Sequence, residues 1–145
     1  MARWISAELR RTIADRAKQL CEYCLIAEED TFYGCEVDHI ISLKHSGSSE
    51  PNNLAYACAL CNRAKGSDVG SIATSGEFTR FFNPRADRWA EHFGLEGATI
   101  QPLTPIGEVT AGILSFKTAH DFTSVKNCLD LVSIRATLPQ RSWLL

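Results

Sequence analysis

The spacing of apolar residues predicts a helix near the start of the chain and a strand after it. Between Ser6 and Leu20 apolar side chains recur at helical spacing, with Ser6 as the expected N-cap. Trp4 and Ile5 precede this helix and are expected to pack against the core. Residues 32–41 alternate loosely between apolar and polar side chains, as a half-buried strand does. Helix and strand together indicate an α+β fold.

The pattern beyond residue 76 predicts a helical extension over residues 77–137. Residues 98–103 indicate a strand, and Thr104-Pro105 is a typical helix start for a helix that runs to about Phe116. Residues 121–137 place their apolar side chains on one helical stripe. The core candidates of the extension are aromatic: Phe78, Phe81, Phe82, Trp89 and Phe93.

Length and composition are those of one ordinary globular domain. The chain has 145 residues, of which 45% are hydrophobic and 22% charged, so we expect a single domain over residues 1–145. No apolar run is long enough to cross a bilayer, and residues 1–4 do not begin a secretory signal. We therefore expect a cytoplasmic protein with no membrane partner, whose paired cysteines favour metal binding over disulfides.

Two CxxC pairs frame the middle of the chain: Cys21, Cys24, Cys58 and Cys61. Each pair can form a tight knuckle that presents two thiolates, so the spacing predicts one zinc ion with four sulfur ligands. Such a shell leaves no open coordination position, and the zinc would hold the fold without doing chemistry. The remaining cysteines, Cys35 and Cys128, are interpreted as small buried apolar residues rather than nucleophiles.

Polar residues between and after the knuckles form a second pattern: Asp38, His39, Asn53 and Asn62. Asn62 directly follows Cys61, and residues 60–65 predict a short helix that stops near Gly66. This DH…N…N pattern between two CxxC knuckles resembles the HNH (ββα-metal) endonuclease family over residues 21–66. The last position of the motif is Asn62 rather than His, so the chain resembles an HNN variant of that family.

The resemblance implies a small ββα-metal (His-Me finger) core over residues 21–66, stapled by the four-cysteine zinc site and flanked by the helix at 6–20 and the C-terminal extension. It also implies a metal-dependent endonuclease that hydrolyses phosphodiester bonds in DNA. His39 would be the general base, since imidazole titrates near neutral pH. Asp38 and Asn62 would supply oxygen ligands to Mg²⁺ or Mn²⁺. The expected cofactors are therefore structural Zn²⁺ and this catalytic cation, with no small-molecule cofactor.

Two further expectations follow from the same resemblance. Asn53 would restrain the loop of the hairpin so that His39 stays aimed at the attacking water, although an asparagine here could also be a plain turn former. Adjacent residues in an extended strand point to opposite faces. The family's solution is a sharp change of direction at Asp38-His39, which would bring both side chains to one phosphate.

Basic residues near this core are candidates for DNA contact. Lys44 and His45 begin a polar loop, and Arg63 and Lys65 are expected to project from the helix at residues 60–65. The alternatives are ordinary turn chemistry for the first pair and solvated charge for the second. The same ambiguity holds for Arg10 and its basic neighbours on the first helix, where a solvated face is the simpler interpretation.

The overall charge argues against tight non-specific DNA binding. The formal charge is −2, and a zinc ion with four thiolates adds another −2, giving about −4 for the zinc-bound protein. Since Lys and Arg supply most non-specific affinity for DNA, affinity would have to come from a local patch, from the metal or from a partner that delivers the substrate. A double-strand break by a single site would require two encounters or a homodimer.

The alternative function is a non-catalytic zinc-stabilised module that binds nucleic acid or protein. Four cysteines fit it as well as they fit a nuclease, and only the set of Asp38, His39, Asn53 and Asn62 argues against it. A third interpretation, a secreted disulfide protein, requires a signal sequence that the first residues do not supply.

Overall fold

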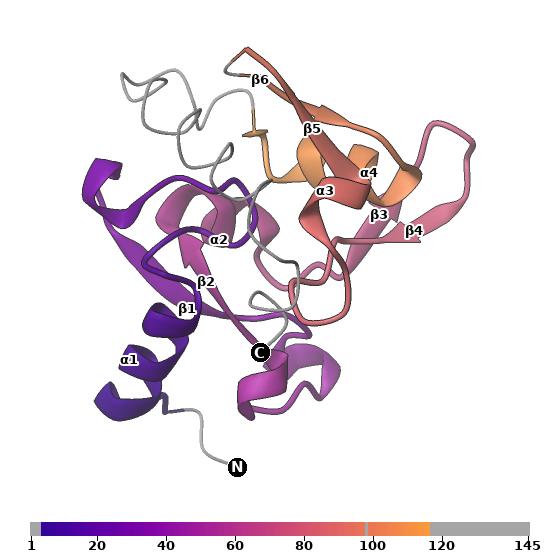
Figure 1. Ribbon diagram of the computed structural model, residues 1–145. Coiled ribbons are helices and arrows are strands. Elements are labelled where there is room, and N and C mark those ends of the chain that lie inside the picture. The colour runs from indigo at the N-terminus through magenta and orange to yellow at the C-terminus, as the bar shows by residue number, and fades with distance from the viewer. Residues whose placement is uncertain (1–3, 98, 117–145) are drawn as a thin grey trace.

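The computed structural model of the chain describes residues 4–97 and 99–116 (Figure 1). Helices and short antiparallel strands are mixed, which confirms the α+β class. The elements in chain order are α1 (Ala7–Arg16), β1 (Cys35–His39), β2 (Leu54–Cys58), α2 (Ala59–Lys65), β3 (Gly70–Ile72), β4 (Phe78–Arg80), α3 (Trp89–His92), β5 (Phe93–Glu96), β6 (Thr99–Pro102) and α4 (Pro105–Ile113).

Helix α1 begins where the sequence predicts and ends earlier. The Ser6 hydroxyl accepts a hydrogen bond from the backbone N–H of Leu9 at 3.1 Å, which is the N-cap geometry. The helix ends at Arg16 rather than at residue 20, because Lys18 and Gln19 have φ angles of +56° and +55°. A helix cannot continue through that left-handed backbone.

The apolar stripe of α1 faces the core as expected. Ile13 and Ala17 are buried, and so is Leu20 just beyond the helix. Ile5 packs against this core, but Trp4 is 81% exposed. The expectation that Trp4 anchors the N-terminus is therefore wrong, and Ile5 alone makes that contact.

Strands β1 and β2 form an antiparallel hairpin whose register runs from Cys35 opposite Cys58 to His39 opposite Leu54. The strand is shorter than the predicted 32–41, because Gly34 turns the backbone with a φ of +74° and Phe32 before it is 93% exposed. All five residues of β2 are buried. The hairpin is thus the centre of the N-terminal half of the fold.

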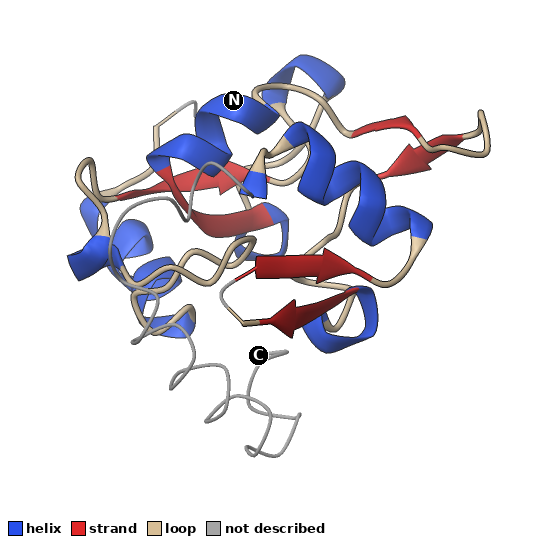
Figure 2. Cartoon of the chain, turned by 90° about the horizontal axis from the view of Figure 1, so that it is seen from above, coloured by secondary structure: helices blue, strands red, loops and turns tan. Residues whose placement is uncertain are grey.

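Over its described residues, 77–97 and 99–116, the C-terminal extension is not the helical segment that the sequence predicted. The described chain beyond α2 forms two more hairpins, β3 with β4 and β5 with β6, together with α3 and α4. Figure 2 shows the resulting three separate two-stranded sheets. The strand expected at 98–103 is confirmed as β6, and α4 begins after Thr104, whose hydroxyl accepts from the N–H of Gly107. The helix expected at residues 121–137 lies outside the described residues.

Aromatic side chains form the core of this second half. Phe81, Phe82 and Phe93 are buried, and Trp89 packs beside Phe93 with ring centroids 5.1 Å apart. Phe78 is 64% exposed, so its assignment to the core is wrong. The residue lies on β4 of a two-stranded sheet, where one face remains in solvent.

Two polar contacts tie the halves together at the first knuckle. The indole N–H of Trp89 donates to the backbone oxygen of Tyr23 at 2.8 Å, and Arg85 forms an ion pair with Glu22. In Figure 1 the elements β3–β6, α3 and α4 lie to one side of the β1–β2 hairpin and α2. Within the described part of the chain, no helix has both the length and the apolar character needed to cross a bilayer.

Candidate active site

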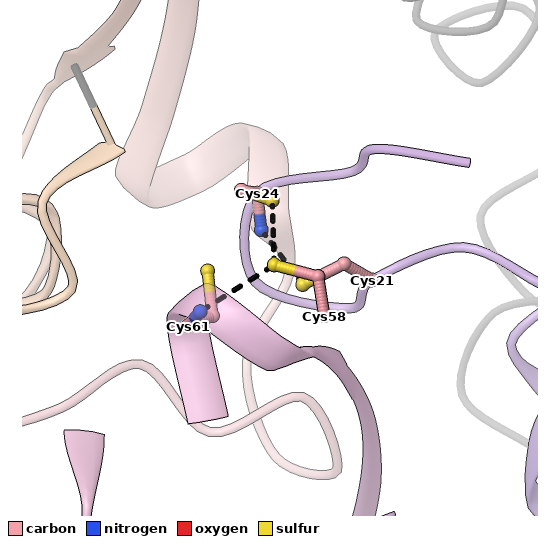
Figure 3. Close-up of side chains that lie close together, drawn as sticks. All are labelled: Cys21, Cys24, Cys58 and Cys61. Atoms are coloured by element: carbon pink, nitrogen blue, oxygen red, sulfur yellow. Dashed lines mark hydrogen bonds between the residues drawn. The ribbon is translucent and has the colours of Figure 1, made fainter. Parts of the chain in front are cut away.

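The four cysteines of the CxxC pairs converge on one point. Their sulfur atoms all lie within 4.8 Å of one another and are buried (Figure 3). The sulfurs of Cys24 and Cys58 are 3.7 Å apart. A tetrahedral zinc with Zn–S bonds of about 2.3 Å has sulfur–sulfur edges of about 3.8 Å, so this donor set fits zinc in both type and size.

The backbone of each knuckle supports the sulfurs. The N–H of Cys24 donates to Cys21 Sγ and the N–H of Cys61 donates to Cys58 Sγ, both at 3.4 Å. Hydrogen bonds with Cys21, Cys24 and Cys61 lower the pKa of Cys58. Hydrogen bonds with Cys21 have the opposite effect on Cys24 and Cys61 and raise the pKa values of these two thiols. Without a cation one thiolate is favoured at the expense of its neighbours, whereas a divalent metal stabilises all four.

A fifth sulfur lies beside this cluster without joining it. Cys35 is buried opposite Cys58 in the hairpin. Burial raises its pKa, and the sulfurs of Cys21 and Cys58 raise it further. This confirms a buried apolar role for Cys35, because a thiol held protonated is a poor nucleophile. Cys128 lies outside the described residues.

The second knuckle fixes Asn62 in space. Cys58 is the N-cap of α2, and Asn62 follows Cys61 within that short helix. Helix α2 ends at Lys65, and Gly66 with a φ of +53° forms its C-cap, as expected. The Asn62 amide nitrogen donates to the carboxylate of Glu36 on β1 at 2.6 Å. Glu36 is a partner of Asn62 that the sequence did not reveal.

Asn53 braces the loop that follows β1. Its Oδ1 accepts from the N–H of Ile41 at 2.9 Å, and its Nδ2 donates to the carbonyl oxygens of Ile41 at 2.9 Å and Ser48 at 2.7 Å. A Cβ at Gly47 would lie 1.7 Å from the Ile41 oxygen, so only glycine allows this close approach. One side chain therefore ties both ends of residues 41–48 to the start of β2.

His39 ends β1 next to this loop. Its imidazole is half-buried, and Nε2 lies 3.0 Å from the Ser49 hydroxyl in a hydrogen bond. Its backbone oxygen accepts from the Lys65 ammonium at 3.0 Å. Ser49 in the loop thus holds the imidazole ring, and Lys65 on α2 holds the end of β1.

The Asp38 side chain is only 4% exposed, and its hydrogen bonds are separate from those of His39 Nε2 and the Asn53 side chain. The Tyr23 hydroxyl donates to its Oδ2 at 2.7 Å, and the Lys65 ammonium pairs with both carboxylate oxygens at 3.2–3.3 Å. Burial raises the pKa of Asp38, while Lys65 and the Tyr23 hydrogen bond act to lower it. The buried carboxylate is stabilised because it is both paired and hydrogen-bonded.

The expected change of direction at Asp38-His39 is not found. Both residues are paired in β1, opposite Ala55 and Leu54, so the two side chains leave opposite faces of the hairpin. Carboxylate and amide oxygens are the correct donors for Mg²⁺ or Mn²⁺. However, both carboxylate oxygens of Asp38 are engaged by Lys65. Asn62 bonds Glu36 through its amide nitrogen, which leaves its amide oxygen as the donor for a cation. A cation held by Asp38 and Asn62 therefore does not fit this arrangement unless Lys65 moves.

Comparison with protein families gives a match over this same segment. Residues 21–68 match the family model described as HNH endonuclease. They form an HNH domain. The match begins at Cys21, the first cysteine of the cluster, and ends just after α2, so it covers both knuckles, the hairpin and the motif residues. Searches of curated proteins and of solved structures gave no match to the chain.

The predicted DNA-contacting residues of the HNH domain differ in exposure. Lys44 and His45 are exposed in a single 3₁₀ turn, and Arg63 is exposed with its guanidinium 5.7 Å from the Tyr33 ring. Lys65 is 2% exposed, so the expectation that it projects from α2 is wrong. Its ammonium is turned inward because it neutralises the buried Asp38 carboxylate.

Sequence reasoning missed the partners that hold the motif of the HNH domain. None of these partners, Tyr23, Ser49 and Glu36, is identified as a site residue from the sequence. All three act through contacts between segments 10 to 26 positions apart in sequence. The single available signal was the placement of Tyr23 inside a zinc knuckle, which fixes the direction of its side chain.

Proposed function

We propose that the HNH domain is the cutting domain of a metal-dependent DNA endonuclease. The observation that carries this proposal is the Asn53 brace in a segment that matches the HNH endonuclease family. An asparagine that serves only as a turn former has no need to hold both ends of a loop beside a histidine. A brace of this kind supports catalysis, because small displacements of a reacting group reduce rates strongly.

His39 is the proposed general base. Nε2 is engaged by the Ser49 hydroxyl, which can accept or donate this hydrogen bond. In the tautomer that carries its proton on Nε2, that N–H donates to Ser49 and Nδ1 accepts a proton from water, and the proposal assigns this tautomer to the reaction. The activated water then attacks the phosphorus of a phosphodiester, the bond from phosphorus to the 3′ oxygen breaks, and the released 3′ oxygen takes a proton from solvent.

A divalent cation, Mg²⁺ or Mn²⁺, is the proposed second cofactor beside structural zinc. When bound, such a cation stabilises negative charge on the phosphoryl and leaving oxygens. Asp38 and Asn62 remain the proposed ligands by donor type. The ion pair between Lys65 and Asp38 opposes that assignment, and loading of the cation on Asp38 requires this pair to open.

The proposed substrate contacts are Lys44, His45 and Arg63, which are exposed around the HNH domain. Lys65 can join them only after it has left Asp38. With a formal charge of −2, long-range attraction to DNA is weak. A homodimer or a protein partner that delivers the DNA would compensate for it.

The direct test uses the zinc-loaded protein and supercoiled plasmid. We expect nicked circles in the presence of Mg²⁺ or Mn²⁺ and none after that cation is withdrawn while zinc content stays constant. Accumulation of nicked circles before linear DNA would indicate one cut per encounter, and direct linearisation would indicate a dimer. Absence of any cutting with either cation would refute the nuclease assignment.

The second candidate is the non-catalytic zinc module. The buried Tyr23–Asp38–Lys65 network favours it, because a carboxylate paired in this way stabilises structure without a substrate. That protein would bind DNA or protein and leave plasmid intact. Binding of labelled DNA measured beside cleavage therefore separates the two functions.

A further inference from the structure

We propose that helix α1, which precedes the HNH match, contributes a positioning residue to the cutting site. That residue is Arg16, whose guanidinium holds the turn that carries Asn53. The inference rests on the proposed nuclease function and extends the functional unit beyond residues 21–68.

Arg16 contacts the turn on both sides of Asn53. Its Nη1 donates to the backbone oxygen of Pro51 at 2.9 Å, and its Nη2 donates to that of Leu54 at 2.6 Å. The two acceptors lie 35 and 38 positions away in sequence. A guanidinium presents parallel N–H donors in a rigid fork, so the two bonds fix both the position and the direction of the turn.

The turn transmits this constraint to His39 by two routes. The backbone oxygen of Asn53 accepts from the N–H of Ile40, the residue directly after His39, at 2.9 Å. The side chain of Asn53 holds Ile41 and Ser48, and Ser48 directly precedes the Ser49 that bonds the imidazole. Movement of the turn would therefore shift both the strand end and the partner of the ring.

Arg16 also belongs to a polar cluster that covers the outer edge of β2. The Glu22 carboxylate accepts from the N–H of Tyr56, and Arg85 from the C-terminal extension pairs with Glu22. Burial lowers the pKa of Arg16 and Arg85 lowers it further, while Glu22 acts in the opposite direction. Among the described residues, Arg16 Nε is buried without a partner. Burial of this donor without a partner costs free energy. The two hydrogen bonds to the carbonyl oxygens of Pro51 and Leu54 offset that cost.

The test compares three variants of the full zinc-loaded chain in plasmid nicking. Arg16→Met keeps the apolar stem and removes the fork, Arg16→Lys keeps the charge, and Arg11→Met removes one charge from an exposed position on the same helix. We expect Arg16→Met to lower kcat about 10- to 100-fold with KM changed less than about twofold. Arg16→Lys should fall between it and wild type, because one ammonium cannot reproduce the fork, and Arg11→Met should keep the wild-type kcat.

Assays are made at a temperature where thermal melts show every variant folded, so a loss of stability alone would leave kcat unchanged. An unchanged kcat for Arg16→Met would overturn the proposal. If KM rises while kcat stays at the wild-type value, the result would indicate that Arg16 contacts DNA instead. If Arg16→Met does not fold, Arg16→Lys decides by the same criteria.

Amide hydrogen exchange gives a readout that does not depend on cleavage. The N–H of Ile41 is bonded to Asn53 Oδ1, so we expect its exchange to be several-fold faster in Arg16→Met, with the helical N–H of Ile13 unchanged. Equal exchange at Ile41 in wild type and variant would refute the brace. If the wild-type protein does not cut DNA, the proposed function fails while this measurement still tests the role of Arg16.

Discussion

Replacement of Asn53 by aspartate is the sharpest probe of the loop brace. The two side chains have the same shape, and aspartate keeps an oxygen for the N–H of Ile41. It replaces the amide nitrogen by a second carboxylate oxygen, which would face the carbonyl oxygens of Ile41 and Ser48 at 2.9 and 2.7 Å. Two attractive contacts thereby become repulsive. Asn53→Ala, by comparison, only deletes them.

The magnitudes follow from the three hydrogen bonds of the Asn53 side chain. Each contributes about 0.5–1.5 kcal/mol net, and water can replace part of that at exposed positions. Asn53→Ala should therefore lower the free energy of unfolding by about 1.5–2 kcal/mol. Asn53→Asp should lower it by about 1 kcal/mol more, since an uncompensated acceptor–acceptor contact adds to the loss. The rate of nicking should fall about tenfold or more in both, in the same order.

The assays are urea unfolding at constant zinc and plasmid nicking under single-turnover conditions. Asn52→Asp is the matched control, because it adds the same charge at the adjacent exposed position; it should remain within about 0.5 kcal/mol of wild type. If Asn53→Asp is as stable and as active as Asn52→Asp, the brace does not hold the loop and the reasoning is refuted.

Three further predictions concern the frame around the site. Cys58→Ala removes one of the four expected zinc ligands, so the zinc content measured by mass spectrometry should fall below one ion per chain. Circular dichroism should show unfolding, because structural zinc supplies on the order of 10 kcal/mol to folding. A folded, zinc-loaded variant would contradict the four-cysteine site. Trp89→Phe deletes the N–H that donates to Tyr23 and should cost about 1–2 kcal/mol in urea unfolding without loss of zinc. Burial acts to raise the pKa of Asp87, but the hydrogen bonds from Arg80 and from the N–H of Asn83, together with the charge of Arg80, outweigh it and lower that pKa. A depressed pKa stabilises the fold above the unfolded value of about 3.9 and ceases to do so as pH falls through the folded value. The stability difference between wild type and Asp87→Asn should therefore be constant well above about pH 4 and shrink as pH falls below about 4. A difference that stays constant at those lower pH values would contradict the ion pair.

Features fixed by short-range spacing could be predicted from the sequence. Each CxxC pair closes a knuckle through its own backbone, so convergence of Cys21 and Cys24 with the second pair needed only the chain to fold back once. The start of α4 at Thr104-Pro105 and the end of α2 at Gly66 are equally local, because capping and left-handed backbone depend on one or two residues.

Features that depend on contacts between distant segments could not be predicted. The inward turn of Lys65 follows from the burial of Asp38, and nothing in a run of Asn-Arg-Ala-Lys indicates which cation faces the core. The left-handed backbone of Lys18 and Gln19 ends α1 early although the sequence continues the helical pattern to Leu20. Strands of three or four residues such as β4 and β5 are too short to show alternation, so the sequence pattern does not predict them within the extension.

The central claim is that an imidazole in a zinc-built frame activates water for phosphodiester hydrolysis. Cleavage of supercoiled plasmid by His39→Ala, compared with wild type at equal zinc content and equal folded fraction, tests it most directly. The account predicts that the variant retains zinc and the native circular dichroism spectrum and loses nicking with both Mg²⁺ and Mn²⁺. Nicking by the variant at the wild-type rate would contradict it.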